Sequence, residues 1–199
     1  SGQMEILEVP FPSIGKGQIL VRNYYSVVSS GTEGKTVSDA RKGYIAKARS
    51  RQKEVKMVIE MIKTNGLLDT YKLVMNKLEA PAALGYSCAG EVIAVGDGVS
   101  DIQVGDFVAC GGQGAYHADV VSVYRNLCVK VPSGVELKHA AFTTIAAIAI
   151  QGIRQADLKM GESCVVIGLG VIGQLTIQIL NAAGIKTIGV DIDDNQVEA

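Results

Sequence analysis

Gly168, Gly170 and Gly173 form a G-x-G-x-x-G motif directly after the short apolar run Cys164–Ile167, and Asp191 ends the next apolar run. This spacing can bind a dinucleotide. The first glycine permits the tight turn from strand to helix, the second lets pyrophosphate approach the backbone, and the third lets the helix pack against the strand. The carboxylate of Asp191 would accept hydrogen bonds from the adenosine ribose hydroxyls.

The surroundings of the motif strengthen this interpretation and indicate which dinucleotide binds. The helix that begins within the motif presents free N–H groups and a positive dipole end to phosphates. A 2′-phosphate on the ribose would face Asp191, with Asp193 and Asp194 nearby and no Arg or Lys between residues 191 and 199. The sequence therefore favours NAD over NADP. The alternative is an α/β protein whose glycine turn binds nothing, or binds another nucleotide such as FAD.

The amino-acid composition is that of an ordinary globular protein. Its 199 residues are 48% hydrophobic and 20% charged, with a formal net charge of −1, which is ordinary for a globular protein. No apolar run approaches the roughly 20 residues of a membrane helix. The four cysteines form no CxxC pair, so we expect reduced thiols, no structural zinc lobe and a cytoplasmic location. Both ends look interrupted, and we expect the chain to be a fragment.

Hydrophobic periodicity divides the chain into β-rich and helical stretches. Residues 1–35 are β-rich: Met4–Val9 partly alternates, Gln18–Tyr25 is typical of a strand, and Ser29–Gly34 is expected to be a loop. Residues 36–80 predict two amphipathic helices separated by Gly66, the second with an apolar stripe of Leu67, Leu68, Tyr71, Met75 and Leu78.

The remainder predicts a second β-rich region and a βαβ unit. Short strands are expected at 90–96, 105–109 and 119–123, and a helical run at 140–156. The run Cys164–Ile167 suits a parallel strand buried on both faces, followed by a helix over Gln174–Ala183 and a strand over Lys186–Val190. The fold class is thus mixed α and β.

This order of elements resembles the medium-chain dehydrogenase/reductase family, which joins a GroES-like, partly open β-barrel to a Rossmann domain. The segments 90–96, 105–108 and 161–173 carry the resemblance. It implies a GroES-like substrate and catalytic domain over residues 1–150, with a helical insertion at 36–80. Residues 151–199 would begin the NAD-binding Rossmann domain with its first βαβ unit, truncated there.

The resemblance also extends the cofactor site and suggests a subgroup. It implies that the dinucleotide contacts Leu169, Val171 and Ile172 in the turn, Ile192 after the acid, and Thr144 at the nicotinamide. Thr143 and Thr144 can equally serve as helix caps. The helical insertion, with the segments 66–68 and 84–87, is closer to two-module oxidoreductases in which a second Rossmann module is fused downstream.

The catalytic zinc positions of that family are changed. Its Cys-Gly-Thr-Asp loop corresponds to Ser30–Glu33, and its Gly-His-Glu segment to Gly85–Ser87, so Ser30 replaces a thiolate and Tyr86 an imidazole. A serine hydroxyl and a neutral tyrosine are poor zinc ligands. We therefore expect no metal. Ser30 and Tyr86 can relay a proton from a substrate hydroxyl, with Thr32 bonding substrate or Ser30; alternatively, they only fill the vacated site.

Two other features carry less weight. His117 falls near the substrate side of the barrel by the resemblance, although a lone histidine in a strand is more often structural. The stretch from Lys35 to Pro81 contains eleven basic residues and five acidic ones. Such a basic segment can steer an anionic substrate or bind nucleic acid, but a solvated helix face is the preferred interpretation, and Tyr44 and Tyr71 are too few for base stacking.

These inferences converge on a zinc-independent, NAD-linked oxidoreductase that transfers hydride to or from an alcohol or carbonyl, with sugar derivatives among the candidates. The alternative is a non-catalytic cofactor-binding or substrate-presenting module of a larger fused protein; a nucleic-acid-binding relative is a third. We expect a small-molecule substrate and neither a membrane nor a nucleic-acid partner. The oligomeric state stays open, a homo-oligomer included. With two of about six Rossmann strands, the chain alone should bind dinucleotide poorly and be inactive.

Overall fold

The computed structural model describes residues 3–41, 52–79 and 81–198, and the chain divides into two compact units. The first comprises Ser1–Pro10 and Val28–Gly85, and the second Phe11–Val27 and Tyr86–Ala199. The second unit contains both the main sheet and the βαβ segment, so the boundary expected at residue 150 remains a prediction.

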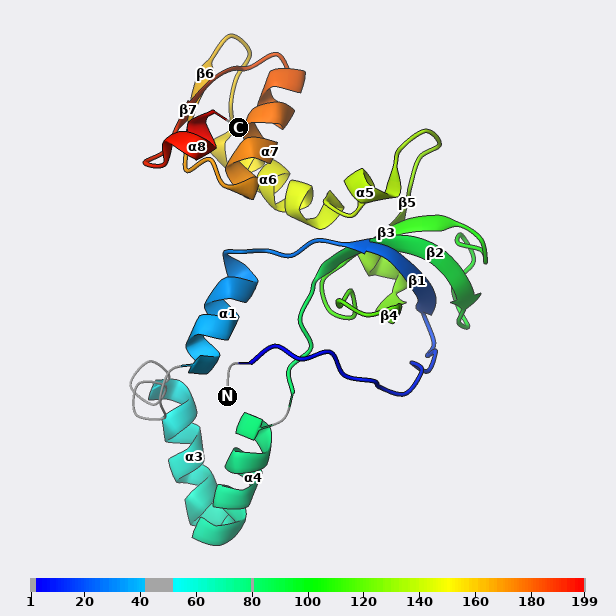
Figure 1. Cartoon of the computed structure of the whole chain (residues 1–199), viewed down its shortest axis with the longest axis vertical. Helices are drawn as coiled ribbons and strands as arrows, with labels where there is room; N and C mark the ends of the chain where they lie inside the picture. The colour runs from blue at the N-terminus through cyan, green and yellow to red at the C-terminus, as the bar shows by residue number, and fades with distance from the viewer. Residues whose placement is uncertain (1–2, 42–51, 80, 199) are drawn as a thin grey trace. The chain divides into compact units, whose positions relative to one another are not determined.

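An antiparallel five-stranded sheet dominates the second unit (Figure 1). Its strands lie in the order β4-β1-β2-β3-β5, and β4 and β5 are its two edges, so the barrel is partly open. They are β1 (Gln18–Ser26), β2 (Ser87–Val95), β3 (Phe107–Gly111), β4 (Val120–Tyr124) and β5 (Cys128–Lys130). The sheet confirms the expected barrel class; β3 begins two residues later than predicted, and sequence periodicity missed the three-residue β5.

Alternation along β2 and β3 builds two separate hydrophobic clusters, because successive strand residues point to opposite faces. Cys88 and Cys110 face an inner cluster that includes Ile19, Val21 and Val123. Their neighbours Ala89 and Ala109 face the outer cluster, formed with Val27, Ala140, Ala141 and Ile145. Small alanines on the outer face let the helices that follow the barrel approach the sheet closely.

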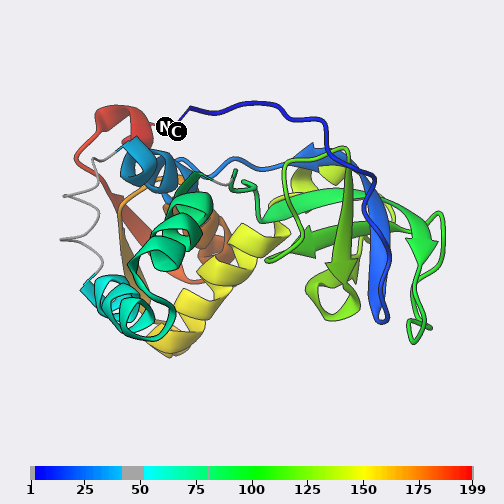
Figure 2. The same cartoon turned by 90° about the horizontal axis from the view of Figure 1, so that it is seen from below.

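Those helices lead into the βαβ unit. After η1 (Arg125–Leu127) and β5 come α5 (Leu137–Ala140) and α6 (Thr143–Ala156), two helices where periodicity predicted one. Figure 2 shows that the N-terminal end of α6 lies beside the sheet and that the helix extends away from it. Then follow β6 (Ser163–Ile167), α7 (Val171–Ala182), β7 (Lys186–Val190) and α8 (Asp194–Val197). β6 and β7 pair in parallel, from Ser163 with Lys186 to Ile167 with Val190, which confirms the first Rossmann βαβ unit.

Two details of this unit differ from the sequence prediction. β6 is not buried on both faces, since Val165 and Ile167 are 55% and 84% exposed. Within the described residues the sheet has only two strands, and exposed and half-buried residues alternate along both of them. Helix α7 begins at Val171 rather than Gln174, because the turn feeds directly into the helix at Gly170.

The regular structure described in the first unit consists of helices, and residues 3–10, 28–31 and 81–85 of this unit are irregular or turns. It contains α1 (Thr32–Arg41), α3 (Gln52–Asn65) and α4 (Leu67–Glu79), and α3 packs on α4 across Gly66, whose φ of +81° suits a glycine (Figure 2). Of the apolar stripe predicted for α4, Leu67, Leu68 and Tyr71 are exposed and Met75 is half-buried, whereas Thr70, outside the stripe, is buried; the side chain of Leu78 lies outside the described ones. No helix in the described part of the chain is long and apolar enough to cross a membrane.

Near the N-terminus, two sequence predictions are wrong. Met4–Val9 is not a strand, because among the described residues it has no neighbouring strand to pair with, and its apolar side chains are exposed. The predicted loop Ser29–Gly34 becomes helical at Thr32. Ser29 caps that helix: its Oγ accepts a hydrogen bond from Thr32 N at 3.3 Å, and its own N–H donates to Glu33 Oε2 at 2.7 Å.

Candidate functional site

The glycine turn between β6 and α7 depends on Gly168 and Gly173 for its shape. Gly168 has a φ of +91°, which side chains other than glycine rarely adopt, and its N–H donates to Val190 O at 2.8 Å. A Cβ on Gly173 would overlap the carbonyl oxygen of Gly168 and lie 2.9 Å from its carbonyl carbon. The first and third glycines of the motif are therefore required by the fold itself.

Gly170 differs from both, because the fold does not require a glycine there. Its φ is −64° with an extended ψ of −175°, and a Cβ would meet no heavy atom within 4 Å. Gly170 is also the N-cap of α7, where no side chain caps the helix and no acid lies in the first turn. Free N–H groups beside open space are what a phosphate needs, so the residues present fit a dinucleotide pyrophosphate.

Asp191 lies at the end of β7 next to this turn. Its Oδ2 accepts a hydrogen bond from Leu169 N at 2.5 Å, and its Oδ1 accepts one from Asp193 N at 3.0 Å. The bond from Leu169, followed by that from Asp193, holds the pKa of the Asp191 carboxyl below its usual value. The carboxylate is thus ionised and anchored, and its remaining lone pairs can accept ribose hydroxyls.

The other predicted cofactor residues divide into buried and exposed ones. The Leu169 side chain is 3% exposed and would lie 3.0 Å from a Cβ placed on Gly189, so it packs the glycine turn against β7. Val171, Ile172 and Ile192 expose their side chains. The backbone of Leu169 therefore positions Asp191, while the exposed side chains around the turn are available to a ligand.

Tyr86 lies directly before β2, half-buried against the outer cluster. Its carbonyl oxygen accepts a hydrogen bond from Gly112 N at 2.8 Å. The next residue, Ser87, is fully buried and donates from Oγ to Ala141 O at 2.6 Å. These bonds fix the end of the strand that carries Tyr86 to the segment between α5 and α6.

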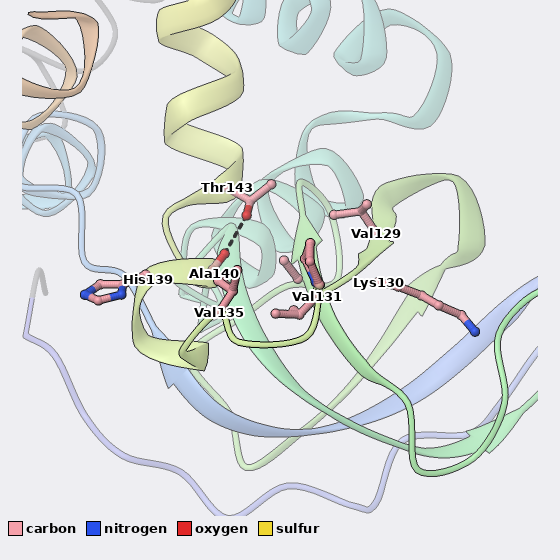
Figure 3. Close-up of a pocket in the computed structure, with 9 residues that line it drawn as sticks. Val129, Lys130, Val131, Val135, His139, Ala140 and Thr143 are labelled. Atoms are coloured by element: carbon pink, nitrogen blue, oxygen red, sulfur yellow. Dashed lines mark hydrogen bonds between the residues drawn. The ribbon is translucent and has the colours of Figure 1, made fainter. Parts of the chain in front are cut away.

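Thr143 and Thr144 begin α6 beside the same end of the sheet. Thr143 Oγ1 donates to Ala140 O at 2.7 Å, which satisfies a carbonyl of the preceding helix (Figure 3). Thr144 Oγ1 donates to Cys110 O over a longer 3.4 Å, and the hydroxyl would lie 2.5 Å from a Cβ on Gly111. Neither threonine caps the N-terminus of α6, whose N-cap is Phe142.

Helix α7 joins the glycine turn to this region. Leu175, two residues beyond Gly173, packs against the same outer cluster as Tyr86, and Ile145 of α6 is buried in that cluster. The structure therefore brings Tyr86, the first turn of α6 and the first turns of α7 around one hydrophobic cluster, although they are far apart in sequence.

Ser30 and Thr32 belong to the first unit, at the start of α1, and both are exposed. Thr32 N–H donates to Ser29 Oγ, and Thr32 O accepts a hydrogen bond from Thr36 Oγ1 at 3.0 Å. Glu33 is buried and anchors the turn. That Ser30 and Thr32 meet Tyr86 stays a prediction. Among residues 3–41, 52–79 and 81–198, no three His, Cys, Asp or Glu side chains gather as a metal site.

Two features were missed or underweighted by sequence reasoning. His117 Nδ1 lies 2.9 Å from Ser26 Oγ at the end of β1, a pairing that only the fold reveals because the residues are 91 positions apart. A mainly apolar pocket of about 310 Å³ lies between β5 and the α5–α6 segment, with Val131 and Val135 beside Ala140 and with Lys130 and His139 extending away (Figure 3). None of Ser30, Tyr86 or the glycine turn lines it.

Comparison with known proteins agrees with this geometry. The sequence model of the alcohol dehydrogenase GroES-like domain matches residues 51–148. The chain is 34% identical to (R,R)-butanediol dehydrogenase of Bacillus subtilis over 133 residues, covering 55% of this chain and 38% of that protein. It is 37% identical to D-guloside 3-dehydrogenase of Escherichia coli over 110 residues, covering 54% and 31%. The chain thus spans less than half the length of these relatives.

Solved structures show the same fold. Alcohol dehydrogenase TADH from a Thermus species has a TM-score of 0.72 at 20% identity, with 99% of this chain and 57% of that chain covered. Galactitol-1-phosphate dehydrogenase from Escherichia coli has a TM-score of 0.71 at 19% identity, with 99% and 55% covered. Residues 51–148 therefore match the GroES-like domain of alcohol dehydrogenases, the relatives named here are dehydrogenases, and the solved structures share the fold of this chain.

Proposed function

We propose that this chain is the barrel and first Rossmann unit of a zinc-independent, NAD-linked oxidoreductase that transfers hydride to or from an alcohol or carbonyl. The observation that carries the proposal is Gly170. It needs no glycine for its own conformation or packing, yet it leaves open space at the uncapped start of α7, beside the anchored Asp191. A ligand with a phosphate and a ribose accounts for all three features.

NAD is supported over NADP by the charges around this turn. Asp191 is ionised and fixed by two backbone N–H groups, and Asp193 and Asp194 follow it. A 2′-phosphate would be placed against this acidic segment with no cation in it, at an electrostatic cost. The ribose hydroxyls of NAD, in contrast, can donate to the carboxylate.

The bound nicotinamide would supply or accept the hydride, and the chain's own residues must handle the proton. Tyr86 is the best-placed candidate, because its position is fixed by the bonds of Tyr86 O and Ser87 Oγ at the start of β2. Ser30 and Thr32 would extend the relay from the first turn of α1. Zinc independence is supported by the donors themselves, since Ser30 and Tyr86 stand where the family supplies thiolate and imidazole.

Sugar derivatives are included among the candidate substrates because the relatives include a guloside dehydrogenase and sorbitol dehydrogenases. A second function, a cofactor-binding module without chemistry of its own, is favoured by one observation. The candidate relay residues are divided between the two units, with Ser30 and Thr32 in the first and Tyr86 in the second.

Measurements of substrate turnover and of cofactor affinity, made on the protein encoded by the whole reading frame, separate these functions. Calorimetry should show NADH binding more tightly than NADPH, and Asp191→Ala should weaken it. Tyr86→Phe should lower kcat by about 100-fold, the typical size of a general acid–base contribution. Tyr24→Phe is the matched control, because its hydroxyl contacts Glu91 on the exposed surface at 3.3 Å. Wild-type turnover by Tyr86→Phe would eliminate the relay, and tighter NADPH binding would refute the cofactor assignment.

A further inference from the structure

Three cysteines that are far apart in sequence lie opposite one another in neighbouring strands. Cys88 of β2 pairs with Cys110 of β3, and Cys110 pairs with Cys128 of β5. Directly opposed residues in a sheet project to the same face, so the three thiols form a row on the inner side of the barrel. They are 0%, 2% and 8% exposed, respectively, and the proposed function uses none of them.

The backbone hydrogen bonds show that the two cysteine pairs differ in kind. In an antiparallel ladder, hydrogen-bonded and non-hydrogen-bonded pairs alternate. Gly112 N donates to Tyr86 O at 2.8 Å, and two residues along the ladder Cys88 and Cys110 therefore form a hydrogen-bonded pair. The bond from Val131 N to Phe107 O at 2.9 Å lies three positions from Cys110, which makes Cys110 and Cys128 a non-hydrogen-bonded pair.

This difference selects one pair for covalent linkage. Non-hydrogen-bonded pairs have Cα atoms about 4.5 Å apart and side chains closer together, against about 5.5 Å for hydrogen-bonded pairs. Disulfides span Cα separations of about 4.4–6.8 Å and Cβ separations of about 3.5–4.5 Å. Cys110 and Cys128 therefore already stand within bonding range with little movement of either strand.

The surroundings of the two thiols give them different roles. Hydrogen bonding with Cys110 and the nearby Arg125 guanidinium hold the pKa of the Cys128 thiol below its usual value, and Arg125 Nη1 also donates to Cys128 O at 2.7 Å. The pKa of Cys110 is raised by the flanking thiols and by burial. Cys128 is also the most exposed of the three. It is thus the nucleophile, and Cys110 is the partner thiol that resolves the product.

We propose that Cys110 and Cys128 form a reversible disulfide when the protein meets a hydroperoxide. The Cys128 thiolate attacks the distal peroxide oxygen, the O–O bond breaks, and the alkoxide or hydroxide leaves as alcohol or water after protonation. Cys110 sulfur then displaces hydroxide from the resulting sulfenic acid, which forms the S–S bond and releases water. In sum, two thiols and one hydroperoxide give a disulfide, water and an alcohol, or a second water.

Thiol counting on the purified, fully reduced chain tests this assignment. After treatment with hydrogen peroxide, denaturation and alkylation, the mass should show two of the four cysteines lost to alkylation and recovered by dithiothreitol. Peptide mapping should place the bond between Cys110 and Cys128. Cys110→Ser should abolish the bond, whereas Cys88→Ser and Cys164→Ser, the matched controls, should leave it intact.

Three results would overturn the proposal. They are alkylation of all four thiols after peroxide treatment, a mapped bond between Cys88 and Cys110, and a bond that requires Cys164. Because Cys110→Ser can disturb the buried row, Cys128→Ser provides a second variant at the more exposed end. It should also abolish the bond, and persistence of a two-thiol loss in it would equally count against the assignment.

Discussion

Substituting the second and third glycines of the motif by alanine separates the ligand site from the fold. At Gly170 the backbone already has a φ of −64°, and a Cβ meets nothing within 4 Å. The stiffer unfolded chain stabilises Gly170→Ala by about 0.4–1 kcal/mol, while the poorer N-cap costs a similar amount. We therefore expect a free energy of unfolding within about 1 kcal/mol of wild type, and a Tm within roughly 2–4 °C.

Gly173→Ala should behave in the opposite way. Its Cβ would overlap the Gly168 carbonyl, so α7 must move away from the turn. Overpacking of this kind costs about 1–3 kcal/mol, which lowers Tm by several degrees. The clash is with backbone atoms, so no side-chain rotation relieves it.

Although Gly170→Ala should leave the free energy of unfolding nearly unchanged, we expect it to weaken NADH binding. The methyl group would occupy the space beside the free N–H groups of α7, and a comparable overpacking cost of about 1–3 kcal/mol corresponds to a loss of NADH affinity of roughly 5- to 150-fold. Differential scanning calorimetry and titration calorimetry measure the two quantities on the same samples. Unchanged NADH affinity in a folded Gly170→Ala protein would refute the assignment of this space to pyrophosphate.

Three further predictions concern the surroundings of the site. The pKa of Asp191 is lowered in the folded state, so the carboxylate stabilises the fold above the ordinary pKa of 3.8, and this stabilisation is lost as pH falls through the lower folded pKa. Acid titration followed by circular dichroism should therefore show a flatter acid limb for Asp191→Asn than for wild type. Thr143→Val should lower the free energy of unfolding by about 1 kcal/mol, because it removes the 2.7 Å bond to Ala140 O, whereas Thr144→Val, which removes a 3.4 Å bond, should mainly raise KM for NADH. If the two variants had equal effects on unfolding and on KM, the nicotinamide contact of Thr144 would be contradicted. Ser87→Ala should cost about 1–3 kcal/mol in urea unfolding, since it leaves the buried Ala141 carbonyl unpaired, and Ser122→Ala, at a half-buried site, is its control.

The glycine turn could be predicted from sequence because its constraints are local. Gly168 and Gly173 act on atoms only a few residues away, and Asp191 follows at the end of the next strand. The same applies to Gly66 between α3 and α4. Ser29 was misjudged, since a run of small residues is typical of loops, and the cap became visible only with the bond between its N–H and Glu33.

Burial and pairing were harder to predict because they depend on distant partners. The apolar composition of β6 indicates a strand but not how many neighbours cover it, and Ile167 is 84% exposed. Likewise, Met4–Val9 alternates without a strand beside it. The cysteine row needs the register of three strands, which no spacing between positions 88, 110 and 128 contains.

The arrangement of clusters connects the cofactor turn with the candidate proton donor. Tyr86 and Leu175 pack against the same outer cluster, whose alanines, Ala89 and Ala109, alternate with the cysteines of the inner row. The cluster is held by the buried bond from Ser87 to Ala141, so loosening that bond should shift Tyr86 and α7 together. A Ser87→Ala variant that loses turnover and NADH affinity in proportion would indicate such coupling, whereas loss of turnover alone would mean that the glycine turn is positioned independently of β2.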